Sequence, residues 1–181
     1  MTVPVYDYVL MTEPLTPGQK AAIGWDNRQG LADLANQFHY SRLTKDDRIL
    51  YGGYDAIYHA GRKVRAEYES RPESYRTLAS HLLTTFPQLE GIRFSHRWAG
   101  AIDTSTRFCA FHGLARQGRV AYASGFTGLG VGATRFAAEV MGQHRSRQPI
   151  RSVTHVIHLT LHKVGRKGRG LQPEPGTTSS D

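Results

Sequence analysis

The chain has 181 residues, of which 39% are hydrophobic and 21% charged, with 19 glycines and a formal net charge of +8. This length suits one domain with its own core, and the composition excludes a coiled coil, a collagen-like protein and a membrane protein. No apolar stretch approaches the ~20 residues that span a bilayer, and the first residues lack the features of a signal peptide. The single cysteine, Cys109, cannot form an internal disulfide, so we expect a reducing, cytoplasmic setting.

The positive charge is concentrated at the C-terminal end. Residues 143–181 hold seven basic and two acidic residues, whereas residues 1–142 hold 16 basic and 13 acidic residues. The body is therefore close to neutral, which argues against a basic surface that grips nucleic-acid phosphates. A nucleic-acid role through the Arg/Lys/Gly-rich tail stays an alternative to a solvated, disordered terminus.

The first half of the chain predicts strands and one amphipathic helix. Residues 5–11 alternate like a strand, and Thr16 and Pro17 begin a short helical turn through Ala22. Runs at 37–44 and 48–53 predict a hairpin around the polar residues 45–47. Pro72 begins the strongest predicted helix, over 73–86, because one face carries apolar residues at helical spacing: Tyr75, Leu78, Ala79, Leu82, Leu83 and Phe86.

The second half predicts three more strands and a second helix. The strands cover 92–98, 108–113 and 119–124, with a turn at Gln117 and Gly118. A glycine-rich segment, 125–132, then opens a helix of about ten residues with Phe136, Ala137, Val140 and Met141 on one face. This order favours an α+β fold in which helices cover one face of an antiparallel sheet.

The segment Gly125-Phe-Thr-Gly-Leu-Gly-Val-Gly132 places free backbone N–H groups at a helix start. Such groups and the helix dipole favour an anion or an electron-rich carbonyl, and Arg135 in the first turn can add positive charge. The G-x-G-x-G spacing matches neither the dinucleotide fingerprint nor a P-loop. A tight turn that lets helix and strand pack closely is the competing interpretation.

Several segments together resemble the C-terminal half of the FAD-dependent oxidoreductases of the D-amino-acid oxidase superfamily, in the branch related to gamma-glutamylputrescine oxidase. The segments are PVYDYVLMTEPL (4–15), FHYSRLTKDDRILYGGYDAIYHAG (38–61), TFPQLEGIRFSHRWAGAIDTSTRFCAFHG (85–113) and GRVAYASGFTGLGVGATRFAAEVM (118–141).

The resemblance implies three regions. Residues 1–118 correspond to the antiparallel substrate domain, 119–142 to the last strand–glycine loop–helix of the FAD-binding domain, and 143–181 to a basic, disordered tail without a family counterpart. The family's ADP-binding unit has no counterpart here, so we expect a truncated chain, with a separate chain as a possible source of the nucleotide-binding half.

The resemblance also implies a cofactor, FAD, and a reaction. Hydride passes from a C–N carbon of an amine or amino acid to the flavin, and the imine product hydrolyses. The residues expected to meet the flavin ring are Thr127, Gly128, Leu129, Gly130, Val131 and Gly132. Many amino-acid-using relatives carry an arginine shortly after the segment that corresponds to Trp98-Ala99-Gly100. This chain has Asp103 there and no arginine, which favours a cationic amine as the substrate.

Five residues are candidates for the substrate pocket, each with a structural alternative: Tyr40, Arg42, Tyr54, Trp98 and Asp103. In the first strand of the hairpin, Tyr40 and Arg42 share a face opposite His39, where cross-strand packing is the alternative. Tyr54 can equally pack at a chain reversal, and Trp98, on the same face as His96, can be a buried structural residue.

Two further features are expected to be inert. Cys109 lies in an apolar run and is expected to be buried. His155, His158 and His162 have no neighbouring acid or cysteine, so no metal site is expected.

Besides the oxidoreductase hypothesis, two alternatives remain: a folded, non-catalytic remnant or subunit that needs a partner chain, and a nucleic-acid-binding protein acting through its tail.

Overall fold

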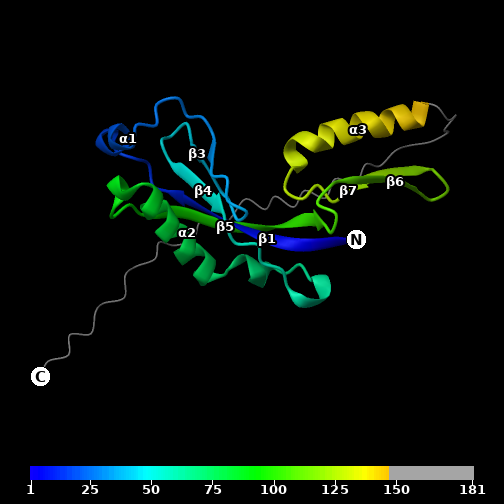
Figure 1. Cartoon of the computed structure of the whole chain (residues 1–181), viewed down its shortest axis with the longest axis horizontal. Coiled ribbons are helices and arrows are strands. Elements are labelled where there is room, and N and C mark those ends of the chain that lie inside the picture. The colour runs from blue at the N-terminus through cyan, green and yellow to red at the C-terminus, as the bar shows by residue number, and fades with distance from the viewer. Residues whose placement is uncertain (147–181) are drawn as a thin grey trace, which may run out of the picture.

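The computed structural model describes residues 1–146 and contains two antiparallel sheets (Figure 1). The five-stranded sheet has the order β2 (Leu31–Ala32), β3 (His39–Leu43), β4 (Ile49–Gly53), β1 (Thr2–Thr12) and β5 (Phe94–Ser105). The second sheet pairs β6 (Phe111–Ala115) with β7 (Val120–Ser124), and the α-helices are α1 (Pro17–Ile23), α2 (Pro72–Thr85) and α3 (Gly130–Ser146). Helices mixed with antiparallel sheets agree with the predicted α+β class.

The central strand β1 separates the two faces of the larger sheet. Because side chains alternate along a strand, Tyr6, Tyr8 and Leu10 all point to the same face, where each is almost fully buried. There they pack in one core cluster with Leu78 and Leu82 of α2. One face of the sheet is therefore covered by α2, as expected from the sequence.

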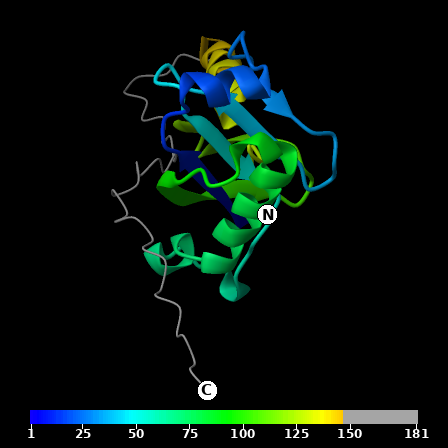
Figure 2. The same cartoon turned by 90° about the vertical axis from the view of Figure 1, so that its left-hand side faces the viewer.

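The helix α2 forms for the reasons that the sequence indicates. Pro72 occupies the first turn, and Tyr75, Leu78 and Leu82 are buried. The helix stops before Pro87, which begins a short 3-10 turn through Leu89. In the turned view of Figure 2, α1 and α2 lie nearest the viewer and α3 lies behind the sheet.

The short helix α1 is defined by its caps. Thr16 accepts from the N–H of Gln19 (3.2 Å), and the Gln19 side chain accepts from the N–H of Thr16 (2.9 Å), which completes a capping box. Gly24 ends the helix in the left-handed conformation, at φ 63°. Trp25, which follows, stacks on Phe86 and joins α1 to the main core.

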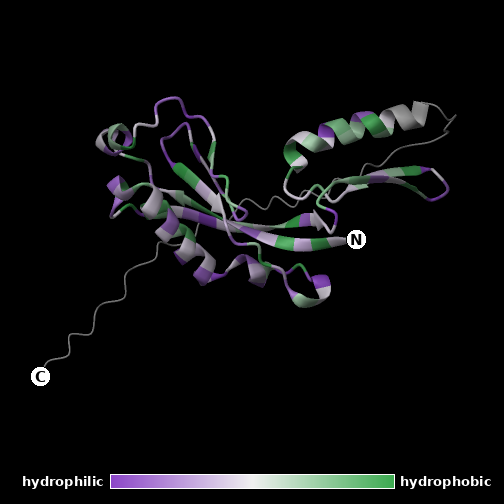
Figure 3. Cartoon of the chain, viewed as in Figure 1, coloured by the Kyte–Doolittle hydropathy of each residue, from purple (hydrophilic) through white to green (hydrophobic). Residues whose placement is uncertain are grey.

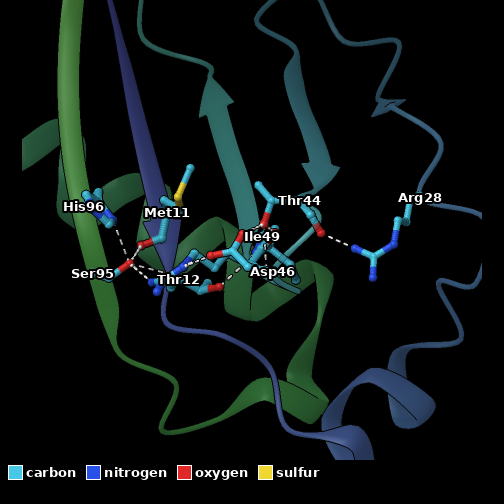
Figure 4. A network of polar contacts seen from close by, with 9 residues as sticks. Met11, Thr12, Arg28, Thr44, Asp46, Ile49, Ser95 and His96 are labelled. Atoms are coloured by element: carbon cyan, nitrogen blue, oxygen red, sulfur yellow. Dashed lines mark hydrogen bonds and ion pairs between the residues drawn. The ribbon is translucent and has the colours of Figure 1, made fainter. Parts of the chain in front are cut away.

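A network of hydrogen bonds links β1, β4 and β5 next to the β3–β4 turn (Figure 4). Arg48 donates to Ser95 Oγ (2.7 Å), and Ser95 Oγ donates to the Thr12 carbonyl (2.7 Å). The Thr12 hydroxyl accepts from the N–H of Ile49 (2.9 Å), next to the register shift between Met11 and Thr12. The network thus provides hydrogen-bond partners for the Thr12 carbonyl and the Ile49 N–H. Arg48 also forms an ion pair with Asp46 (2.6 Å) in this turn, which lies where the sequence predicts it.

Several predicted boundaries were wrong. The strand expected to end at Trp98 continues to Ser105, because β5 pairs with β1 along nearly the whole length of both strands. Phe108 lies in a turn at φ 53°, so β6 begins only at Phe111. The final helix is longer than expected and extends to Ser146.

The unit formed by β6, β7 and α3 lies at one end of the long strands β1 and β5 (Figure 1). Its strands pair only with each other within residues 1–146, and the pairing crosses the expected domain boundary at residue 118. No helix in the described part of the chain is long and apolar enough to cross a membrane.

Candidate functional site

The glycine loop between β7 and α3 makes a sharp reversal. Gly125, Thr127 and Gly128 have φ values of 76°, 53° and 86°, all in the left-handed region. At Gly125 a side chain is also excluded by space, since a Cβ there would lie 2.9 Å from the Ser105 Cβ and the Phe111 ring. The loop therefore starts in direct contact with the end of β5.

Hydrogen bonds fasten this start of the loop to β5. Asp103 Oδ2 accepts from the N–H of Gly125 (2.6 Å) and from Ser124 Oγ (3.3 Å). The Thr127 hydroxyl accepts from the N–H of Ser105 (3.2 Å) and donates to the Gly125 carbonyl (3.0 Å). In addition, the N–H of Thr127 donates to the Asp103 carbonyl (3.3 Å).

Beyond Thr127, several backbone N–H groups have no hydrogen-bond partner within the described residues. No hydrogen bond within the described residues uses the N–H groups of Gly128, Gly130, Val131 and Gly132. Val131 is 92% exposed, and a Cβ built on Gly132 would meet nothing within 4 Å. The first turn of α3 therefore presents unpaired N–H groups and the positive end of the helix dipole to solvent, an environment that suits an electron-rich or anionic group. Arg135 pairs with Glu139 along the helix (3.7 Å).

The strand register brings three of the five pocket candidates to one face. Tyr40 is paired with Gly52, Gly52 with Val9, and Val9 with Trp98, so these residues form a row across four strands. The neighbouring row contains Arg42 and, on β5, His96. Both rows lie on the side opposite α2, which we call the Tyr40 face.

On the Tyr40 face, Tyr40 donates a hydrogen bond to Asp7 (2.6 Å). Burial raises the pKa of the Asp7 carboxyl, although hydrogen bonds from Tyr40 and from two backbone N–H groups lower it. Burial and the neighbouring Asp7 charge raise the pKa of the Tyr40 hydroxyl, which therefore keeps its proton. The Tyr40 ring reaches Asp7 by crossing Gly52, where a Cβ would lie 2.7 Å from the ring.

The other two candidates lie elsewhere. Tyr54, at φ 68°, stacks on His39 (ring centroids 5.3 Å apart) and meets His81 of α2 edge-on, so it belongs to the α2 side. His39 bonds to Asp33 (2.6 Å) and to His81 (2.9 Å). Asp103 faces the glycine loop, as described above.

Two expectations need correction, and two others concern residues outside the described part of the chain. Cys109 is exposed, because the apolar run that contains it forms the turn between β5 and β6 and does not enter the core. Phe136, expected on the buried face of α3, is 65% exposed, whereas Ala137 is buried. The histidines at 155, 158 and 162 and the tail from 147 lie outside the described residues. Within those residues no group of His, Cys, Asp and Glu is arranged to hold a metal ion.

Sequence reasoning missed Asp7 and Gly52. Asp7 is the one acid among residues 2–12, and such an acid in an apolar strand is a usable signal of a polar partner. The requirement for glycine at position 52 has no sequence signal, because it depends on the ring of a residue in the neighbouring strand.

Comparison with known proteins decides the family. Residues 1–144 match the family described as FAD dependent oxidoreductase (DAO). The chain belongs to this family. Its members use FAD, and the resemblance noted in the sequence is confirmed.

Two curated relatives agree with the family assignment. The chain is 34% identical over 105 residues to gamma-glutamylputrescine oxidoreductase of Escherichia coli (58% of this chain, 22% of the relative). It is 25% identical over 140 residues to the probable oxidoreductase OrdL of Haemophilus influenzae (77% of this chain, 29% of the relative). The chain thus spans less than a third of the length of these relatives.

Solved structures show the same fold. L-proline dehydrogenase from P. horikoshii superposes with a TM-score of 0.65 at 17% identity, and glycine oxidase from Bacillus cereus with 0.61 at 17%. Each comparison covers 81% of this chain and 36% of the other. Iminodiacetate oxidase from Chelativorans gives 0.60 at 15% identity, covering 84% of this chain and 38% of the other.

Proposed function

We propose that this chain corresponds to the C-terminal portion of an FAD-dependent oxidoreductase that oxidises a C–N bond of an amine or amino acid. The proposal is supported by the family and by relatives whose names refer to amino compounds. The observation that carries it lies in the glycine loop and the first turn of α3, where the N–H groups of Gly128, Gly130, Val131 and Gly132 have no partner among residues 1–146.

In this proposal the N–H groups of Gly128, Gly130, Val131 and Gly132 hold the polar edge of the flavin ring, and Thr127 shapes the loop. The N–H of Leu129, expected among these donors, instead donates to the Phe126 carbonyl (2.9 Å). Fixed N–H donors at a helix N-terminus stabilise an electron-rich edge without any reorganisation. Bound FAD supplies the chemistry by accepting a hydride from the carbon next to the substrate nitrogen.

The substrate side of the site is the Tyr40 face. Trp98 supplies a large, half-buried apolar surface that can exclude water, while Arg42 and the Asp7–Tyr40 pair supply the polar groups. Such a combination suits a small molecule that carries an amine, an acid, or both. Tyr54 lies on the α2 side of the sheet and is not part of this proposed surface.

We further propose that the nucleotide-binding part of the enzyme covers the β6–β7–α3 unit, from the same polypeptide or from a separate chain. Apolar residues run along β6, β7 and α3 (Figure 3). Several of them stand exposed in the structure: Phe111, Leu114, Tyr122, Leu129, Val131 and Phe136. A concentration of large apolar side chains at a surface is typical of an interface.

An FAD titration of the purified chain tests the proposal, with flavin fluorescence and protein colour as readouts. Val131→Glu places a negative charge where the flavin edge is proposed to lie, so it should weaken FAD binding. The control, Ala138→Glu, adds the same charge to the same helix at another exposed position and should bind as the wild type does. A chain that stays colourless with excess FAD supports the alternative of a non-catalytic remnant or of a subunit that needs its partner.

A further inference from the structure

We infer that Asp103 is a positioning residue that fastens the glycine loop to the substrate sheet. Its role toward FAD rests on the proposed function, whereas the fastening itself rests only on contacts within the chain. The sequence favours Asp103 as the anion that receives a cationic substrate, but in the structure its carboxylate is directed at the loop.

Two hydrogen bonds orient the Asp103 carboxylate. A carboxylate oxygen that accepts from a backbone N–H at 2.6 Å makes a charge-assisted bond, which is among the stronger hydrogen bonds in proteins. The Ser124 hydroxyl donates to the same oxygen, Oδ2, at 3.3 Å. Asp103 is therefore oriented by two donors, one on the last residue of β7 and one on the first residue of the loop.

The sheet topology leaves the glycine loop dependent on this junction. Within the described residues, neither β6 nor β7 pairs with any strand of the five-stranded sheet. The orientation of the loop relative to β5 thus depends on the junction made by Asp103, Ser105 and Thr127, where four hydrogen bonds link β5 to residues 124–127. The close approach of Gly125 to Ser105 packs the same junction.

The consequence is a direct mechanical link between the two halves of the proposed site. Strand β5 carries Trp98 on the Tyr40 face, and the same strand ends at the residues that hold the loop. Asp103 thereby sets where the N–H groups of the first turn of α3 lie relative to the substrate surface. The placement of these N–H groups affects binding, because small displacements of oriented donors weaken their interaction with a bound group.

The test compares Asp103→Ala, Asp103→Asn and the exposed control Thr106→Ala in the full chain. Hydrogen exchange measured by NMR should show the Gly125 N–H exchanging about ten- to a hundredfold faster in D103A, as expected for the loss of a hydrogen bond to a charged group. D103N keeps an acceptor oxygen and should fall between D103A and the wild type, while T106A should match the wild type. FAD affinity, measured in parallel, should decrease in the same order.

Unchanged Gly125 exchange in D103A and D103N would overturn the inference. Faster exchange with unchanged FAD affinity would also overturn it, because the fastening would then have no effect on the cofactor. Faster exchange in a chain whose wild type binds no FAD confirms the fastening and counts against the proposed function alone. If D103A does not fold, D103N provides the same comparison.

Discussion

Replacing Gly52 by alanine is expected to disturb the Tyr40 face through one contact. The new Cβ would lie 2.7 Å from both Cζ and Oη of Tyr40, whereas non-bonded carbon atoms normally stay about 3.5–4 Å apart. The ring must therefore move away by about 1 Å. Its hydrogen bond to Asp7, now 2.6 Å, then exceeds the length of a real bond.

The size of the effect follows from two opposing terms. Losing a hydrogen bond to a charged group costs about 1.5–3 kcal/mol. Alanine offsets about 0.4–1 kcal/mol of this, because it restricts the unfolded chain more than glycine does. We therefore expect Gly52→Ala to lower the free energy of unfolding by about 0.5–2.5 kcal/mol.

Urea denaturation followed by tryptophan fluorescence measures this change. The matched control is Gly100→Ala on β5, where a Cβ meets nothing within 4 Å and the expected change is neutral or stabilising. In a Tyr40→Ala background the ring is absent, so G52A should cost nothing there. An equal cost in both backgrounds would refute the reasoning, since the contact with the Tyr40 ring could not then be its cause.

Three further predictions concern the ionisation of Asp7, the packing of Leu82 in the core and the exposure of the Cys109 thiol. Burial raises the folded-state pKa of Asp7, so its stabilising contribution is complete below the unfolded pKa of about 3.9 and is lost as pH rises through the folded pKa. Asp7→Asn should therefore gain stability relative to the wild type between pH 3 and pH 7 in urea titrations, and a difference independent of pH would contradict this. Leu82→Ala, at a residue with 0% exposure, should cost about 2–5 kcal/mol in the same assay, whereas exposed Ser80→Ala should change stability by less than about 0.5 kcal/mol. Cys109 should react with a thiol reagent in the folded protein nearly as fast as in urea, while strong protection would show that it is buried.

The sequence alone predicted the local elements well where its pattern was complete within one segment. Pro72 and the apolar spacing of 75–86 predicted α2, and the polar turn at 45–47 predicted the β3–β4 hairpin. The alternation of side chains predicted that His39 and Tyr40 lie on opposite faces of the sheet and that His96 and Trp98 share a face. The strand register confirms both. Propensity, capping and side-chain period act over a few residues, so a single segment contains the information that fixes them.

Only the tertiary structure decided which partners those side chains meet. Asp103 faces Gly125 and Asp7 meets Tyr40 because strands far apart in sequence lie side by side. Tyr54 lies with His81 on the α2 side, and Cys109 stays outside the core although its neighbours are apolar. Alternation specifies the face of a residue but not its neighbour on the next strand, and that neighbour depends on pairing and register across the whole sheet.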